Sequence, residues 1–246
     1  MIDKAAIVTG AGKGIGEALA LKLGAMGIAV CCNSLTDSGE TTARSIRAAG
    51  GRAIFVGGDV AEEETAARVV AETAAAYGGI DILVNNAGVV LPGTAQTTRI
   101  DDWDRTMAVN VRSVFLLSAS ALPHLIGRKG VIVNTSSSVA LKGVKDRLAY
   151  TASKGAVLSM TRAMAADLID RGVRVNCVCP GTTWTPSLDG RLATFPDPEA
   201  KKREFIARQP MGRFGTPEEI ADGIIYLINA PFCTGAILSI DGGMTM

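Results

Sequence analysis

The feature that most constrains the fold is an alternation of two kinds of segment along the whole chain. Short runs rich in apolar and β-branched residues alternate with longer stretches whose apolar residues recur every three or four positions. The first pattern is typical of buried strands and the second of amphipathic helices. Seven strands are predicted, at 5–9, 29–33, 53–57, 82–85, 131–135, 173–179 and 237–240.

The stretches between these strands predict the helices that connect them. Helical periodicity covers 16–26, 40–49, 62–77, 103–127 and 151–170. Strands and helices that alternate at this spacing form a parallel sheet with helices on both faces. We therefore expect an α/β fold of the doubly wound Rossmann type, with seven parallel strands. Neither a repeat nor a low-complexity linker interrupts residues 1–246, so one domain is expected.

The alternation lapses only between residues 182 and 211. Pro186, Pro196 and Pro198 lie in this segment, together with many charged residues. A long irregular segment inside a compact domain is often a mobile element over a functional site. We therefore predict a substrate flap at about 182–211.

Composition excludes several classes of partner. A formal net charge of +1 and only 4% aromatic residues give no reason to expect nucleic acid. No run of 18 or more uncharged apolar residues and no signal-peptide pattern occurs, so neither a membrane span nor secretion is expected. The chain is predicted to be cytoplasmic.

The cysteines and the single histidine offer little material for metal chemistry. Cys177 and Cys179 would share one face of a strand and in principle hold a metal ion. Five cysteines inside apparent strands and loops are more typical of small buried residues in a reducing compartment. His124, the only histidine, has no ligand cluster near it, so neither a zinc site nor a Ser-His-Asp triad is expected.

A glycine-rich segment follows the first predicted strand directly. It reads Thr9-Gly10-Ala11-Gly12-Lys13-Gly14-Ile15-Gly16 and leads into a helix. Glycines there permit a tight turn that brings backbone N–H groups close to a pyrophosphate, and the helix N-terminus adds partial positive charge. Such a cluster alone is also compatible with a simple turn, but its place between strand and helix favours a dinucleotide site.

Two further clusters end predicted strands. Asp59 and Val60 follow the third strand, where the carboxylate is suited to accept a hydrogen bond from an adenine amino group. Asn85-Asn86-Ala87-Gly88 ends the fourth strand and would by itself fit a turn equally well. All three clusters lie at carboxyl ends of strands, the edge at which open α/β sheets bind ligands.

Tyr150 and Lys154 stand four residues apart at the start of a predicted helix and so share one helical face. An ammonium near a phenol favours the phenolate and lowers its pKa toward the working range, although such pairs are also common on surfaces. Ser137 precedes Tyr150 by thirteen positions (150 − 137), and its hydroxyl would hold the reacting oxygen.

Together these motifs resemble the short-chain dehydrogenase/reductase family over essentially the whole chain. The matching segments are TGAGKGIG at 9–16, DV at 59–60, NNAG at 85–88, VNV at 109–111, the SSS run, YTASK at 150–154, PGT at 180–182 and IDGG at 240–243. The resemblance implies a metal-independent oxidoreductase that moves a hydride between a nicotinamide dinucleotide and a carbonyl or alcohol.

The resemblance also implies the roles of individual residues. Asn110, Ser137, Tyr150 and Lys154 would form a catalytic tetrad: Tyr150 exchanges the proton, Ser137 holds the substrate oxygen, Lys154 binds the nicotinamide ribose, and Asn110 holds a relay water. Family members are usually homotetramers or homodimers. The residues implied to bind the cofactor are Gly10, Gly12, Lys13, Gly14, Ile15, Gly16, Ser34, Asp59, Val60, Asn86, Ala87, Gly88, Tyr150, Lys154, Pro180, Gly181, Thr183 and Thr185.

The end of the second strand bears on the choice between NAD and NADP. Relatives that prefer NAD carry an acidic residue there, whereas this chain reads Cys32-Asn33-Ser34-Leu35. Without a carboxylate, nothing at this position repels a 2′-phosphate. Lys13 stands where relatives that use NADP often carry a basic residue, although it could also point into water. NADP(H) is therefore favoured, with NAD(H) as the alternative.

The flap carries the substrate prediction. Its sequence resembles the cytosolic-type 3-hydroxybutyrate and sugar-acid dehydrogenases, which implies that Arg147, Arg191 and Arg208 grip a substrate carboxylate. Each arginine alone would be typical of a solvated surface residue. The missing acidic residue departs from this subgroup and keeps open a 3-oxoacyl-thioester reductase that uses NADPH. A non-catalytic dinucleotide sensor is disfavoured, because all four tetrad positions are kept.

Overall fold

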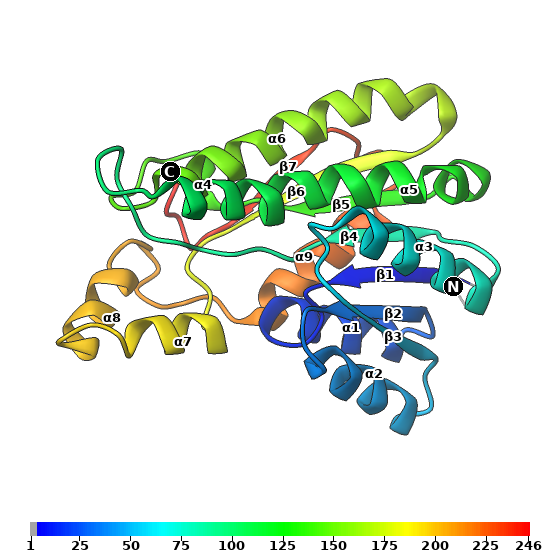
Figure 1. Ribbon diagram of the computed structural model, residues 1–246, viewed down its shortest axis with the longest axis horizontal. Helices are drawn as coiled ribbons and strands as arrows, with labels where there is room; N and C mark the ends of the chain where they lie inside the picture. Colours follow the sequence, from blue (N-terminus) through cyan, green and yellow to red (C-terminus); the bar gives the residue numbers. More distant parts are fainter. Residues whose placement is uncertain (1–3) are drawn as a thin grey trace.

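Seven parallel strands form one sheet in the order β3-β2-β1-β4-β5-β6-β7 (Figure 1). The computed structural model describes residues 4–246. The predicted Rossmann-type α/β fold is confirmed, and each predicted strand is present within one residue of its expected bounds. The strands are β1 Ala5–Thr9, β2 Ala29–Ser34, β3 Ala53–Gly57, β4 Ile82–Asn85, β5 Val131–Thr135, β6 Arg174–Pro180 and β7 Ile237–Ile240.

Helices cover both faces of this sheet. One face carries α1, α2 and α9, and the other carries α3, α5 and α6. The helices are α1 Gly14–Ala25, α2 Ser38–Ala48, α3 Glu63–Tyr77, α4 Ile100–Met107, α5 Ser113–Arg128, α6 Leu148–Leu168, α7 Pro186–Leu192, α8 Pro198–Ile206 and α9 Pro217–Asn229.

The central strands are buried on both sides, which explains their continuous apolar runs. In β1, Val8 faces the layer that contains Leu19 of α1, whereas its neighbour Ile7 faces the layer that contains Leu117 of α5. Successive side chains of a strand point to opposite faces, so a strand covered twice needs apolar residues at every position. The carboxyl ends of all seven strands therefore meet at one edge of a rigid core.

Several helices begin earlier than predicted, among them α1 and α6. The helix α1 starts at Gly14 rather than at residue 16, and α6 starts at Leu148 rather than at residue 151. In α6 the first turn is closed by the backbone N–H of Thr151, which donates to the carbonyl of Arg147 over 2.7 Å. Tyr150 consequently lies inside the first turn of the helix instead of preceding it.

The predicted flap, residues 182–211, contains two helices with no strand between them. Proline is well suited to the first helical position, and Pro186 and Pro198 begin these helices. The Thr185 hydroxyl caps α7 by accepting from the N–H of Leu188, and the Asp197 carboxylate caps α8 by accepting from the N–H of Ala200. Figure 1 shows α7 and α8, in yellow and gold, on the side of the molecule toward which the arrow of β1 points.

The flap also has an apolar core of its own. Leu188 and Leu192 of α7 and Phe205 of α8 are buried together, and Phe214 packs against them. These side chains join the two helices into one unit next to the main sheet.

One arginine holds the short segment between α9 and β7. The guanidinium of Arg174 donates to four carbonyl groups, those of Leu227, Ile228, Ala230 and Cys233, at 2.6–3.3 Å. The last carbonyls of a helix lack partners within the helix itself, and a cation there also interacts favourably with the helix dipole. A single side chain thus satisfies carbonyl groups at the end of α9 and in the segment that leads to β7.

Within residues 4–246, one helical stretch is long and apolar enough to cross a membrane by length and composition alone. It is Ile100–Arg128, which joins α4, a π-helical turn and α5. Leu117, Ala121 and Leu125 of this stretch are buried against the sheet. This packing is that of a core helix.

Candidate functional site

Two adjoining cavities lie at the carboxyl edge of the sheet. The glycine-loop cavity, of about 440 Å³, is bordered by Gly10, Ser34 and Asp59. The tyrosine cavity, of about 240 Å³, is bordered by Tyr150 and by the flap. Both are lined by Gly88, Val90 and Ser187, so they form one continuous groove. Of the residues expected to bind the cofactor, all line one of the two cavities except Gly14 and Gly16.

The glycine loop has no space for larger side chains. A Cβ atom at Gly16 would lie 2.2 Å from the carbonyl oxygen of Gly10, and one at Gly12 would lie 1.9 Å from the Ser38 hydroxyl. Gly10 and Gly14 adopt φ values of +63° and +60°, which favour glycine. The loop therefore presents bare backbone at the N-terminus of α1, and this arrangement fits a pyrophosphate.

Thr9 and Asn86 fasten the glycine loop to the end of β4. The Thr9 hydroxyl accepts from the N–H groups of Asn86 and Ala87, each over 3.0 Å. The Asn86 side chain donates to the Thr9 carbonyl over 3.0 Å. These bonds hold two of the predicted clusters against each other, so Asn86 belongs to the groove rather than to an independent turn.

At the end of the groove predicted to bind the adenosine, the polar side chains of Ser34 and Asp59 already have partners within the protein. The Ser34 hydroxyl accepts from the N–H of Gly39 over 2.9 Å. One carboxylate oxygen of Asp59 accepts from the N–H of Ala61, and the other pairs with Arg105 over 2.6 Å. Lys13 is exposed and lines the same cavity. Arg105 was not predicted, because its approach to Asp59 joins residues 46 positions apart.

Three consecutive serines after β5 have three different surroundings. The Ser136 hydroxyl donates to the carbonyl of Lys154 over 2.7 Å, and that of Ser138 donates to the sulfur of Met244 over 3.2 Å. The Ser137 hydroxyl accepts only a long bond, 3.4 Å, from the N–H of Val139 and also hydrogen-bonds Tyr150. Ser137 is therefore the serine whose hydroxyl lies beside the tyrosine.

Tyr150 and Lys154 are brought to the cavity by one face of α6. The Lys154 ammonium is buried, lies 5.8 Å from the Tyr150 ring centroid and donates to the Thr135 carbonyl over 2.8 Å. Burial lowers the pKa of Lys154 to about 8, so the group is still mostly protonated at neutral pH.

The surroundings of Tyr150 act on its pKa in both directions. Burial raises the pKa, and this effect exceeds the lowering caused by the Ser137 hydrogen bond and by the charges of Arg191 and Arg147. The phenol is consequently protonated at neutral pH and available as a proton donor.

Asn110 lies in a π-helical turn, Ala108–Arg112, that interrupts the helix between α4 and α5. Its side-chain oxygen accepts from the N–H of Val89 over 2.8 Å. Its amide donates to the Val89 carbonyl and to the Ser153 hydroxyl, each over 3.0 Å. Asn110 lines neither cavity and instead ties the loop after β4 to α6. π-Helical turns are frequent at functional sites, but the VNV sequence does not predict that one forms here.

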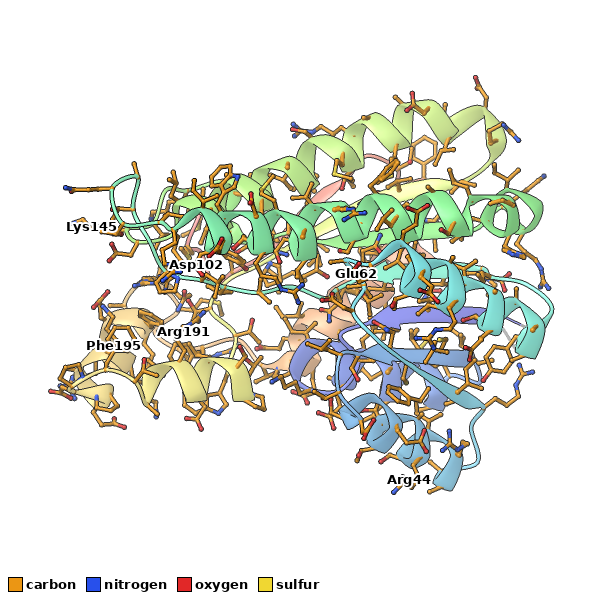
Figure 2. All side chains as sticks on the ribbon, viewed as in Figure 1. Arg44, Glu62, Asp102, Lys145, Arg191 and Phe195 are labelled. Carbon is orange, nitrogen blue, oxygen red and sulfur yellow. The ribbon has the colours of Figure 1, made fainter. Side chains whose placement is uncertain are left out.

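The three predicted arginines converge on the tyrosine cavity. Arg147 is the residue before α6, Arg191 belongs to α7, and Arg208 follows α8; all three line the cavity together with Tyr150. Burial lowers the pKa of Arg147 and of Arg191, and the charges of neighbouring arginines lower both further. In Figure 2, Arg191 lies between the flap and the rest of the protein.

Among the described residues, these guanidinium groups have few anionic partners. Arg208 pairs with the exposed Glu204 over 2.9 Å, and Arg147 donates to the neighbouring carbonyl of Asp146. The buried Nε of Arg191 has no hydrogen-bond partner. The end of the cavity is therefore positively charged and incompletely neutralised.

Apolar residues complete the wall and were not predicted. Val144, Leu188, Phe205 and Met244 line the tyrosine cavity. Met244 is held by Ser138 and by the Lys142 ammonium, which donates to its carbonyl over 3.0 Å. The IDGG motif could have directed attention to the C-terminal segment, because Asp241 accepts from the N–H groups that follow it.

Comparison with known proteins gives matches along nearly the entire chain. A family model described as "Enoyl-(Acyl carrier protein) reductase" matches residues 10–245. An uncharacterised oxidoreductase of Thermotoga maritima is 43% identical, over 98% of this chain and 97% of that protein. A 2-(S)-hydroxypropyl-CoM dehydrogenase 3 of Xanthobacter autotrophicus is 41% identical, over 97% of this chain and 95% of that protein. The dehydrogenase/reductase SDR family member 6 of Aquarana catesbeiana is 38% identical, over 100% and 99%.

Proposed function

The chain belongs to the short-chain dehydrogenase/reductase (SDR) family, an oxidoreductase family acting on CH–OH donors with nicotinamide cofactors, and we propose that its own substrate is a small hydroxy acid. The substrate would be bound through its carboxylate, and its hydroxyl would be oxidised or the corresponding ketone reduced. A short 3-hydroxy acid or a sugar acid fits this description.

The convergence of Arg147, Arg191 and Arg208 on Tyr150 carries this proposal. Arginine presents a planar fork of N–H groups that matches a carboxylate, and a charge-assisted hydrogen bond is stronger than a neutral one. The tyrosine cavity, of about 240 Å³, has room for a small molecule. An anion there would offset charges that the protein itself leaves incompletely neutralised.

We further propose that NADP(H) is the preferred cofactor, with NAD(H) as the alternative. The bare glycine backbone is suited to the pyrophosphate, and Asn86 to Gly88 border the groove between its two ends. Ser34 places no carboxylate where a 2′-phosphate would lie, and Lys13 is available to pair with it. When bound, the dinucleotide supplies or accepts the hydride.

In the proposed mechanism, each of the chain's own polar residues has a separate task. The arginines orient the substrate by its carboxylate, and the Ser137 hydroxyl holds the reacting oxygen. Tyr150 donates its phenolic proton to that oxygen during reduction and takes a proton from it during oxidation. Lys154 would bind ribose hydroxyls and favour the phenolate. Asn110 fixes the loop after β4 against α6 and would support a relay water. As is common in the family, the protein would act as a homotetramer or homodimer, in the cytoplasm.

A panel of substrates tests the hydroxy-acid proposal. Purified enzyme is assayed with NADPH and NADH, or with the oxidised cofactors, on short 3-hydroxy and 3-keto acids, sugar acids, their neutral esters and acetoacetyl thioesters. We expect kcat/KM to be highest for the free acids. A preference for the thioesters would instead favour a 3-oxoacyl-thioester reductase, and equal rates on acids and esters would contradict a carboxylate site.

The cofactor preference is tested at Lys13 and Ser34. Lys13→Ala is expected to raise the Kd of NADPH by about tenfold with little effect on NADH, because a charge-assisted bond to phosphate is worth about 1.5–3 kcal/mol. Ser34→Asp should move the preference toward NADH, because a carboxylate at the end of β2 would accept from ribose hydroxyls and repel a 2′-phosphate. Titration of both variants with both cofactors, followed by fluorescence, measures the change. A wild-type preference for NADH, or equal losses in Lys13→Ala, would contradict NADP(H).

A further inference from the structure

The ring of Phe205 lies at the centre of a group of cations. Its side chain is only 1% exposed, and the guanidinium carbon of Arg208 lies 3.9 Å from the ring centroid. The Lys201 ammonium lies 5.6 Å and the guanidinium carbon of Arg191 5.9 Å from the same centroid. All three are within the distance at which a cation is attracted to an aromatic ring.

The ring itself is fixed from the flap side. Phe205 packs in the small apolar core with Leu188 and Leu192 of α7, and Phe214 covers this core. Arg208 follows Phe205 by three positions, whereas Arg191 comes from the other helix of the flap. Phe205 is thus the one described residue whose ring contacts cationic groups of both helices and also lines the tyrosine cavity.

This arrangement solves an electrostatic problem. Arg191 and Arg208 carry like charges and repel each other; burial and the charge of Arg147 are the larger causes of the lowered pKa of Arg191, and the charge of Arg208 lowers it further. A carboxylate between them would remove the repulsion but would also occupy the N–H groups needed for an anionic ligand. The face of an aromatic ring attracts both cations without using their N–H groups: the Nε of Arg191 has no hydrogen-bond partner, while Arg208 keeps its pair with Glu204.

We propose that Phe205 is a positioning residue of the anion site: its ring holds Arg191 and Arg208 in place for the substrate carboxylate. This inference rests on the proposed function and adds to it the residue that organises the clamp. Phe205 does not itself take part in proton exchange.

The variant Phe205→Leu tests this role, because leucine keeps an apolar side chain in the flap core but has no ring. Loss of cation–π attraction of about 1–2 kcal/mol at a desolvated site corresponds to a rise of about 5- to 30-fold in KM for the hydroxy acid. We expect kcat to be nearly unchanged, and KM for a neutral ester of the same acid to change less than twofold.

Two control variants separate the ring from its surroundings. Phe195→Leu removes a ring that lies 5.0 Å from Lys201; among the described residues neither Arg191 nor Arg208 stacks on this ring, so KM should not change. Leu192→Val loosens the same flap core but keeps the Phe205 ring. A rise in KM as large in Leu192→Val as in Phe205→Leu would assign the effect to packing and overturn the proposal.

A second measurement makes the result independent of the substrate. Phenylglyoxal modifies accessible guanidinium groups, and peptide mass spectrometry gives the rate at each arginine. In Phe205→Leu we expect faster labelling of Arg191 and Arg208 and an unchanged rate at Arg213, which pairs with Glu219 away from the cavity. Unchanged labelling together with unchanged KM would overturn the role of Phe205, even if arginine variants impair acid binding. Faster labelling of the arginines with no change in KM for any acid would instead overturn the proposed function.

Discussion

Replacing Tyr150 with phenylalanine is expected to lower kcat by at least roughly a hundredfold, because general acid–base catalysis usually contributes 10²- to 10⁴-fold. Phenylalanine keeps the ring and its packing on α6 but removes the hydroxyl next to Ser137. Steady-state kinetics in both directions, with a cofactor titration by fluorescence, measures the effect. Cofactor affinity should change little, since the glycine loop is untouched.

The pH profile of the wild-type enzyme provides the control for this variant. Burial raises the pKa of Tyr150, so the phenol is protonated at neutral pH. Reduction, which needs the protonated form, should be lost as pH rises through that pKa, whereas oxidation, which needs the phenolate, should gain. The residual rates of Tyr150→Phe should show neither this loss of reduction nor this gain of oxidation as pH rises. A variant that retains most of its turnover would remove Tyr150 from the proton-exchange step.

Removal of Arg147 or Arg191 is expected to raise KM for a short hydroxy acid by about ten- to a hundredfold. Each guanidinium would contribute a charge-assisted hydrogen bond worth about 1.5–3 kcal/mol. The alanine variants are compared with wild type on one acid and on its neutral ester. The ester should be used almost normally, because it has no negative charge to be gripped.

Two further variants sharpen this comparison. Arg191→Lys should rescue acid binding only partly, since an ammonium lacks the planar fork of donors. Arg213→Ala is the matched control: Arg213 also follows the flap, but it pairs with Glu219 and lines no part of the tyrosine cavity. Equal losses on acid and ester in Arg191→Ala would mean that the arginine supports the flap rather than the substrate.

The parts of the site that the sequence predicted depend on local geometry. The glycine spacing is dictated by one turn: Gly16 must lack a Cβ because the Gly10 carbonyl lies beside it. Tyr150 and Lys154 meet because four residues make about one helical turn. The convergence of the three arginines was predicted from the resemblance of the flap, not from any spacing, since they come from three separate elements.

The parts that were missed depend on contacts between distant residues or on ambiguous local signals. A proline in a sequence can mark either the end or the start of a helix, so only the caps at Thr185 and Asp197 show that helices start at Pro186 and Pro198. Arg105 reaches Asp59, and Met244 reaches Ser138, across 46 and 106 positions. Phe205 resembles any buried aromatic residue of an amphipathic helix until its cationic neighbours are seen.

The close approach of Gly14 to Thr185 bears on how ligands reach the groove. A Cβ at Gly14 would lie 3.0 Å from the Thr185 methyl group, so the glycine loop touches the residue that caps α7. Ser187, in the first turn of α7, lines both cavities. Because α7 borders both cavities, movement of this one helix would change access to the cofactor end and to the substrate end of the groove together.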